Sequence, residues 1–297
     1  MELTRAQMDA IFTALNTSLN KGQAKAWTGH DRWSNSIASS TAGEKYPMAL
    51  VTGGMRKWIG DRVINKLSGN ALTVLNEDYE HTEAVSLNDI KDDQVGYYSV
   101  LFESMGVDSE NLWPRLATEA LLAPGKWADG VNFYSATRKL GKATYNNIVN
   151  DALSLTSYET AREQMMAFTD TTGQNPLALV PDMIIVGQQL ESTAKKLFKS
   201  SLIVDSGVAV DNPHKDEVEV QVNPWLTGTH AAKWFLVCTT RGIKPISVQK
   251  REVGPLNRWD QPHDACVKDH NEAHYGLHYR GAAAGVAPFL VIGGNLG

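Results

Sequence analysis

Cysteine and long apolar runs are both scarce in this sequence. The 297 residues include only two cysteines, Cys238 and Cys266, which are too few for a disulfide framework and predict two free thiols in a reducing compartment. The longest apolar runs, Met183–Val186 and Phe235–Cys238, fall far short of the roughly 20 residues that a transmembrane helix needs. The first residues also lack the basic-then-apolar pattern of a signal peptide. We therefore expect a protein made inside the cell, with no membrane span and no membrane partner.

An excess of basic residues is absent as well. With 28 Lys and Arg against 33 Asp and Glu, the formal net charge is −5, which argues against a generally basic nucleic-acid binder. The charge is unevenly spread: residues 1–70 carry +4, residues 71–130 carry −9, and the remainder is balanced. A basic start and an acidic middle can attract each other within one chain or between neighbouring chains. The acidic side chains can equally do no more than solvate an exposed surface, and the sequence leaves these alternatives open.

Motifs of catalysis and nucleotide binding are missing too. The sequence contains no GxGxxG, GxxxxGK[ST], HExxH or GxSxG pattern. His263, Asp264 and Cys266 are close in sequence, but a nucleophile and its base are assembled in space, so this proximity does not predict a thiol site. We predict no catalytic residue and no cofactor.

Histidines gather late in the chain, at His263, His270, His274 and His278. Tyr275, Gly276 and Tyr279 favour a strand for the last two, which would then lie about 13 Å apart at a rise of roughly 3.3 Å per residue. Zinc binds imidazole nitrogens at about 2 Å, so these two cannot share an ion. We predict surface or interface histidines and no metal site.

Hydrophobic periodicity predicts helices alternating with strands, the α+β class. The first helix runs from Thr4 to about Leu19, with a capping box formed by Thr4 and Gln7. Further helices are expected over 93–122, with a possible interruption at Gly106, from Thr156 with Glu159 completing its capping box, and over 188–199. The later part is rich in strands, expected at 179–186, 218–222, 234–238, 246–252, 274–280 and 289–294.

Two segments before the long helix lack a buried face. Residues 20–54 show no period and are too long for an ordinary connection, so Trp27 and Trp33 are expected to anchor an arm against another surface. Residues 55–92 suggest a hairpin that is polar on both faces, with Glu77, Asp78 and Glu80 at a solvated tip. Because an isolated hairpin is marginal in water, we expect it to lean on a neighbour.

Short motifs in a fixed order give the chain a resemblance to a known family. They are Trp58-Ile59-Gly60-Asp61-Arg62, Asp92-Asp93-Gln94-Val95-Gly96, Pro181-Asp182, Trp234-Phe235-Leu236, Lys244-Pro245 and Gln249-Lys250-Arg251. In this order and at this length they resemble the major head subunit family of Mu-like phages and prophages. One departure lies at Ser135–Arg138, where many relatives carry an acidic residue followed by His-Pro.

The resemblance implies a Hong Kong 97-type capsid fold and the division of the chain that goes with it. Residues 1–54 would form an N-terminal arm and residues 55–92 an extended loop over a neighbouring subunit. Residues 93–175 would hold the spine helix and part of a peripheral domain. Residues 176–245 would form an axial domain, and residues 246–297 would return to the peripheral domain.

The implied function is that of a major capsid protein of a tailed phage or Mu-like prophage. Copies would form hexamers and pentamers of an icosahedral shell, with scaffold, portal and decoration proteins as partners. Packaged double-stranded DNA would contact the inner face without sequence specificity. The chain would reside in the virion, after assembly in the host cytoplasm.

Subunit contacts are expected where the charge split and the aromatic anchors meet. We expect the basic stretch of one copy to face acidic residues of its neighbour. The predicted interface residues are Trp27, Trp33, Arg56, Lys57, Trp58, Asp61, Arg62, Asp92 and Glu103. Two alternatives stay open: a soluble metal-dependent hydrolase that uses the histidines of 263–278, or another structural protein of the virion.

Overall fold

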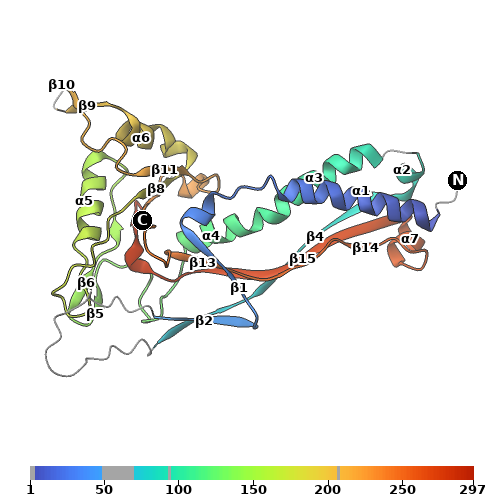
Figure 1. Ribbon diagram of the computed structural model, residues 1–297, viewed down its shortest axis with the longest axis horizontal. Helices are drawn as coiled ribbons and strands as arrows, with labels where there is room; N and C mark the ends of the chain where they lie inside the picture. The colour runs from blue at the N-terminus through green and yellow to red at the C-terminus, as the bar shows by residue number, and fades with distance from the viewer. Residues whose placement is uncertain (1–3, 49–69, 93–94, 206–207) are drawn as a thin grey trace.

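Two β-sheets of different character organise the chain in this computed structural model (Figure 1). It describes residues 4–48, 70–92, 95–205 and 208–297. One sheet belongs to an elongated unit that is layered with helices, and the other lies at the centre of a compact unit at one end of the molecule. Strands and helices are mixed along the chain, which agrees with the expected α+β class.

The elongated sheet is built around β15 (Glu272–Gly285). On one edge of β15 lies β4 (Glu77–Ser86), and on the other lie β13 (Ile246–Val253) and β14 (Asn257–Trp259), all antiparallel to it. Strand β1 (Ser34–Ala38) adds to β13 in parallel. Residues 20–54 were expected to lack regular structure, but part of this segment is a sheet strand whose pairing partner is some 200 residues away.

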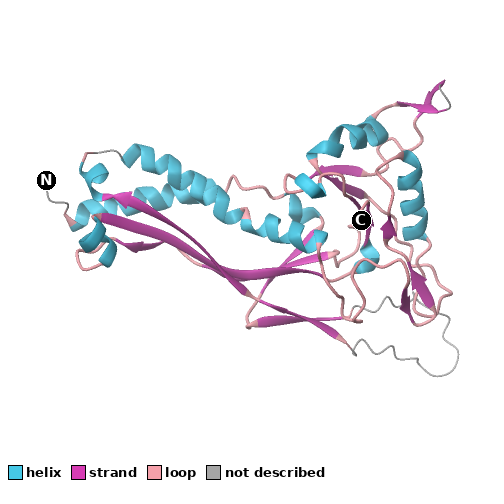
Figure 2. Cartoon of the chain, turned by 180° about the vertical axis from the view of Figure 1, so that it is seen from behind, coloured by secondary structure: helices cyan, strands magenta, loops and turns pink. Residues whose placement is uncertain are grey.

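Helices cover one face of this sheet. They are α1 (Arg5–Gln23), α2 (Leu87–Lys91), α3 (Val95–Glu110) and α4 (Leu112–Leu122). Seen from behind in Figure 2, the long strands run beneath these helices, and among the described elements only the short α7 (Ala265–His270) lies on the other side of the strands, at the end near the N-terminus. The capping box of Thr4 and Gln7 is confirmed at the start of α1.

The break in the predicted 93–122 helix lies at Asn111, not at Gly106. Gly106 is inside α3, where a Cβ atom would overlap the carbonyl oxygen of Leu19 in α1. Gly22 of α1 makes the reciprocal approach, since a Cβ there would overlap the carbonyl oxygen of Glu103. These two glycines let the backbones of α1 and α3 touch, so Gly106 serves helix packing instead of ending the helix.

The compact sheet has the strand order β11-β8-β12-β16-β7. Its strands are β11 (Glu219–Val222), β8 (Met183–Val186), β12 (Trp234–Val237), β16 (Val291–Gly294) and β7 (Ile148–Val149). Helices α5 (Leu155–Met166) and α6 (Gln188–Lys199) pack against it. The predicted helix over 188–199 is confirmed, whereas α5 begins at a cap formed by Ser154 and Ser157, before the cap predicted at Thr156.

Short paired strands and single turns of 3-10 helix complete the chain. The pairs are β2 (Gly43–Pro47) with β3 (Ala71–Leu75), β5 (Arg138–Leu140) with β6 (Ala143–Tyr145), and β9 (Leu202–Asp205) with β10 (Val208–Asp211). The 3-10 turns are η1 (Gly29–Arg32), η2 (Gly228–His230) and η3 (Pro288–Leu290). Of the hairpin expected within 55–92, residues 55–69 lie outside the described residues. The described strands do not pair with each other, because β3 pairs with β2 and β4 pairs with β15. Consequently Glu77, Asp78 and Glu80 lie in a strand and not at a turn tip.

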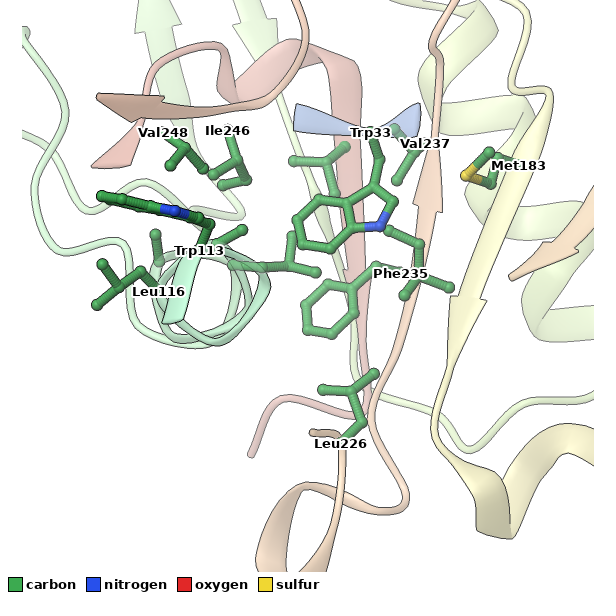
Figure 3. Packing of buried hydrophobic residues seen from close by; sticks show 14 of the residues in the cluster. Trp33, Trp113, Leu116, Met183, Leu226, Phe235, Val237, Ile246 and Val248 are labelled. Atoms are coloured by element: carbon green, nitrogen blue, oxygen red, sulfur yellow. The ribbon is translucent and has the colours of Figure 1, made fainter. Parts of the chain in front are cut away.

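A continuous core joins the two units (Figure 3). The ring of Trp33 lies beside Phe235 and Val237 of β12, and Trp113 of α4 lies near Val248 of β13. Trp33, Trp113 and Phe235 are all fully buried. The two sheets are therefore held together by aromatic packing as well as by the chain itself.

Candidate assembly interface

Both tryptophans of the predicted arm contact their own chain. Trp33 has no exposed surface in the single chain, and its ring packs beside Phe235 and Val237 of β12. Trp27 is half-buried and meets Trp225 edge to face, with ring centroids 5.3 Å apart. The surface against which this arm is ordered is thus the compact unit of the same molecule.

The predicted acidic residues lie in different environments. Asp92 is exposed and follows α2. Glu103 of α3 accepts a hydrogen bond from Lys25 just after α1, and this ammonium group lowers the pKa of the Glu103 carboxyl. The basic group of the prediction, Arg56, Lys57 and Arg62, lies outside the described residues, together with Trp58 and Asp61.

The charge split is satisfied in part within the chain. Besides the pair of Lys25 and Glu103, Arg32 donates two hydrogen bonds to Glu219 of β11. At the far end of the molecule, Arg5 of α1 lies 3.4 Å from the carboxylate of Asp260. Basic residues near the N-terminus therefore fasten α1 and the following turn to later parts of the same chain.

The predicted histidine site is not assembled. His274 and His278 both lie on β15, where His274 is 3.3 Å from Glu272 and His278 is 3.1 Å from Asp78. Within the described ranges, no three His, Cys, Asp or Glu side chains converge as metal ligands. The hydrolase alternative therefore has no support in the described part of the molecule.

Exposed apolar side chains form surfaces that the sequence reasoning missed. On α3, Tyr97, Val100 and Leu101 are 67%, 63% and 43% exposed. The sequence did contain a signal for this surface. The helix carries one apolar stripe that packs on α1 and the sheet, and it has further apolar residues outside that stripe. On β9, Leu202 is 54% exposed, and this strand was not singled out in the sequence. Contiguous exposed apolar surface commonly marks a contact with another protein.

The described residues thus present several exposed surfaces. The helices on the elongated sheet carry exposed apolar residues, and the compact unit ends in a projecting hairpin. None of the helices in the described ranges is both long and apolar enough to span a membrane. Exposed apolar residues of this kind are suited to contacts with other proteins.

Solved capsid structures share this fold. A chain of the bacteriophage JBD30 procapsid has a TM-score of 0.59 at 19% identity, covering 98% of this chain and 75% of that one. A chain of the mature capsid of bacteriophage PhiM1 has a TM-score of 0.55 at 9% identity, covering 88% of this chain and 85% of that one. At these identities the likeness establishes the fold alone, and the expected Hong Kong 97-type fold is confirmed.

Curated proteins give a similarity in sequence. The chain is 27% identical over 156 residues to the Mu-like prophage FluMu major head subunit of Haemophilus influenzae, covering 50% of this chain and 51% of that protein. It is 25% identical over 138 residues to the major capsid protein of Escherichia phage Mu, covering 45% of each. The matches thus span about half the length of these curated relatives.

A family model described as the Mu-like prophage major head subunit gpT matches residues 8–150, 145–226 and 227–289. These three matches follow the order of the chain and leave few residues unmatched at either end. The resemblance expected from the short motifs is therefore confirmed over almost the whole sequence. The chain belongs to the Mu-like prophage major head subunit family.

Proposed function

We propose that this chain is the major capsid protein of a tailed phage or Mu-like prophage, with self-assembly as its function. The observation that carries the proposal is the family match from residue 8 to residue 289. The exposed apolar residues of α3 and β9 support it, because such surfaces suit a protein that is covered on assembly. Copies associate into hexamers and pentamers, which close into an icosahedral shell.

The two units have natural roles in such a shell. The compact unit, which includes residues 176–245, serves as the axial domain near the symmetry axes of the capsomers. The elongated unit serves as the peripheral domain, with α3 and α4 as its spine. Residues 55–92 include the loop that extends over a neighbouring subunit. The C-terminal strand β16 pairs with β12, so the end of the chain belongs with the compact unit and not, as expected, with the peripheral return strands.

The partners follow from the same role. A scaffold directs closure, a portal occupies one vertex, and decoration proteins bind the outer surface. Packaged double-stranded DNA is held by confinement, so the inner face requires no sequence-specific contacts and no strongly basic charge. Assembly takes place in the host cytoplasm, and the finished subunit resides in the virion.

The first test is assembly of the purified full-length chain. We expect capsomer rings or closed shells above a critical concentration, observed by negative-stain electron microscopy and light scattering across a concentration and salt series. A chain that stays monomeric throughout, with or without its scaffold, would contradict the proposal. Stoichiometric zinc in such a monomer would favour the hydrolase, and tubes or open rings would favour a different virion component.

A second test concerns the contact between neighbouring copies. We propose that Arg56, Lys57 and Arg62 of one copy face acidic residues of the next. Asp92 is the better acceptor, because Glu103 already binds Lys25. Arg62→Glu should therefore weaken assembly at physiological salt. Lys268→Glu, an equal charge reversal on the exposed face of α7, is the matched control, and equal assembly of the two variants would contradict this contact.

A further inference from the structure

The hairpin of β9 and β10 stands apart from the rest of the compact unit (Figure 1). Among the described residues its two strands pair only with each other. A two-stranded hairpin with no further strand or helix beside it is marginally stable in water. Its projecting position therefore calls for a surface that covers it in the assembled state.

The base of this hairpin is firmly held. The buried side-chain amide of Asn212 donates hydrogen bonds to the carbonyl oxygens of Leu197, at 2.7 Å, and Ser200, at 3.0 Å. The backbone N–H of Asn212 also donates to the carbonyl oxygen of Ser201. These bonds tie the base of the hairpin to the end of α6, and from there the hairpin projects away from the compact unit.

One face of the hairpin combines an apolar and an acidic group. Leu202 and Asp211 are paired across the two strands and hence share a face, and Ala209 lies two residues from Asp211 on the same face. Leu202 is 54% exposed, and Ala209 and Asp211 are exposed as well. No described residue bonds the Asp211 carboxylate. The segment 202–211 contains two aspartates and no Lys or Arg, so it carries negative charge.

The outer face of α6 offers the complementary surface. A shallow groove of about 580 Å³ is lined there by Gln188, Glu191, Ser192, Lys195, Lys196 and Ser200. Lys195 pairs with Glu191 at 2.5 Å and Lys199 pairs with Asp216 at 2.7 Å. Lys196 is exposed and has no carboxylate partner in the described part of the chain. The long aliphatic stems of the lysines can cover an apolar side chain while their ammonium groups meet a carboxylate.

We propose that the hairpin of one copy docks through its Leu202–Asp211 face into the α6 groove of the next copy. This inference rests on the proposed function and names a contact that would join copies within a capsomer. Asp211 meets Lys196, and Leu202 packs on the lysine stems. Because the contact uses two different patches of the same chain, it is head-to-tail, and a head-to-tail contact closes into a ring when its rotation divides a full turn.

Cysteine cross-linking tests this contact directly. The two natural cysteines, Cys238 and Cys266, are buried, so introduced thiols can be followed on a non-reducing gel. The double variant Ala209→Cys with Ser192→Cys should give a ladder of covalent species that reaches five or six chains under assembling conditions. Each single variant should give none. Covalent dimers from Ala209→Cys alone would show hairpins meeting each other and would overturn the inference.

Charge exchange provides an independent test. Lys196→Glu and Asp211→Lys, each alone, should raise the concentration at which assembly begins by about threefold to tenfold. The combined variant should restore the wild-type value, and Lys268→Glu should leave it unchanged. Circular dichroism and the melting temperature of each variant report whether it folds.

The outcomes separate this contact from the function itself. If the wild type assembles and neither the double cysteine variant cross-links nor the exchanged charges rescue assembly, the contact is overturned and the capsid function stands. If the wild type forms no capsomer under any condition, the proposed function is overturned and the contact with it.

Discussion

The central strands of the compact sheet and the edge strand β4 of the elongated sheet are buried to very different degrees. In the compact sheet every residue of β8, β12 and β16 is buried. In β4 of the elongated sheet only Val85 is buried. A strand that is buried on both faces reads as a continuous apolar run, whereas a sheet with one open face carries polar residues. The central strands of the compact sheet are therefore covered on both faces within one chain, whereas β4 is left largely exposed.

This difference predicts that the two units contribute differently to the stability of the fold and to assembly. The compact sheet supplies buried aromatic and aliphatic area, which dominates the free energy of folding. The elongated unit relies on the helices packed on its sheet, and within that layer α1 and α3 also pack closely on each other. Perturbing each unit in turn should therefore give different effects on unfolding and on assembly.

The largest expected effect lies in the compact sheet. Phe235→Ala removes a fully buried ring at the centre of β12, and such truncations cost about 3–5 kcal/mol. Urea unfolding monitored by tryptophan fluorescence should show this loss. A cost below about 1 kcal/mol would mean that the compact unit contributes little to stability, and the contrast between the sheets would be lost.

A smaller effect is expected at the contact between α1 and α3. Ala is a better helix former than Gly by up to about 1 kcal/mol, but a Cβ at position 106 would overlap the backbone of Leu19. We expect the overlap to prevail in Gly106→Ala, with a net destabilisation of about 1–3 kcal/mol.

Gly96→Ala is the matched control on the same helix. Nothing lies within 4 Å of a Cβ at that position, so stability should stay the same or rise slightly. If both variants were stabilised, the close packing of α1 on α3 would not be needed to hold the elongated unit together.

Acid should weaken a turn beside the compact unit. The Asp170 carboxylate accepts hydrogen bonds from the Thr172 hydroxyl at 2.5 Å and the Asn175 side-chain amide at 2.8 Å, and these donors hold its pKa far below the usual range. Because the folded pKa lies below that of an unfolded aspartate, about 3.9, this stabilisation is complete above about pH 5 and is lost as the pH falls further. Between pH 5 and pH 3 the melting temperature of the wild type should fall more steeply than that of Asp170→Asn. Parallel slopes would contradict this role.

The smallest effect is expected for the pair of Lys25 and Glu103. The Lys25 side chain is exposed and that of Glu103 is half-buried, and ion pairs at the surface contribute little to stability. Glu103→Gln should lower the melting temperature slightly at low salt and not at all at about 1 M salt, where the Debye length falls to about 3 Å. A large effect that persists at high salt would mean that the pair, and not the glycine contact, fastens α1 to α3.

Local patterns predicted several elements correctly. The helix at 188–199 is amphipathic, with an apolar face opposite a charged one, and its pattern was visible in the sequence. The capping box of Thr4 and Gln7 marks the start of α1 as expected. The apolar runs at 234–237 and 183–186 became the buried strands of the compact sheet. These features succeed because capping and periodicity involve residues within one or two turns of each other.

Strand pairing between segments far apart in sequence could not be predicted from such local patterns. Strand β1 pairs with β13, and Trp33 is buried against residues 200 positions later. The described strands within 55–92 belong to two different sheets for the same reason, since β3 pairs with β2 and β4 pairs with β15. The sequence around these strands is polar or shows no period. Their burial could not be read from it, because the residues that pack on them lie elsewhere in the chain. For the candidate interface, the sequence singled out Asp92 and Trp33 alike, and only the structure shows that Asp92 is exposed and that Trp33 is fully buried within its own chain.

The sequence by itself determined the family, through short motifs in a fixed order, and the local helices and strands, through capping and hydrophobic period. Only the tertiary structure decided which charges are already paired within the chain, why Gly106 is required inside α3, and which surfaces stay open. The physical reason is that burial and ion pairing depend on distances between atoms far apart in sequence, and these distances exist only once the chain has folded.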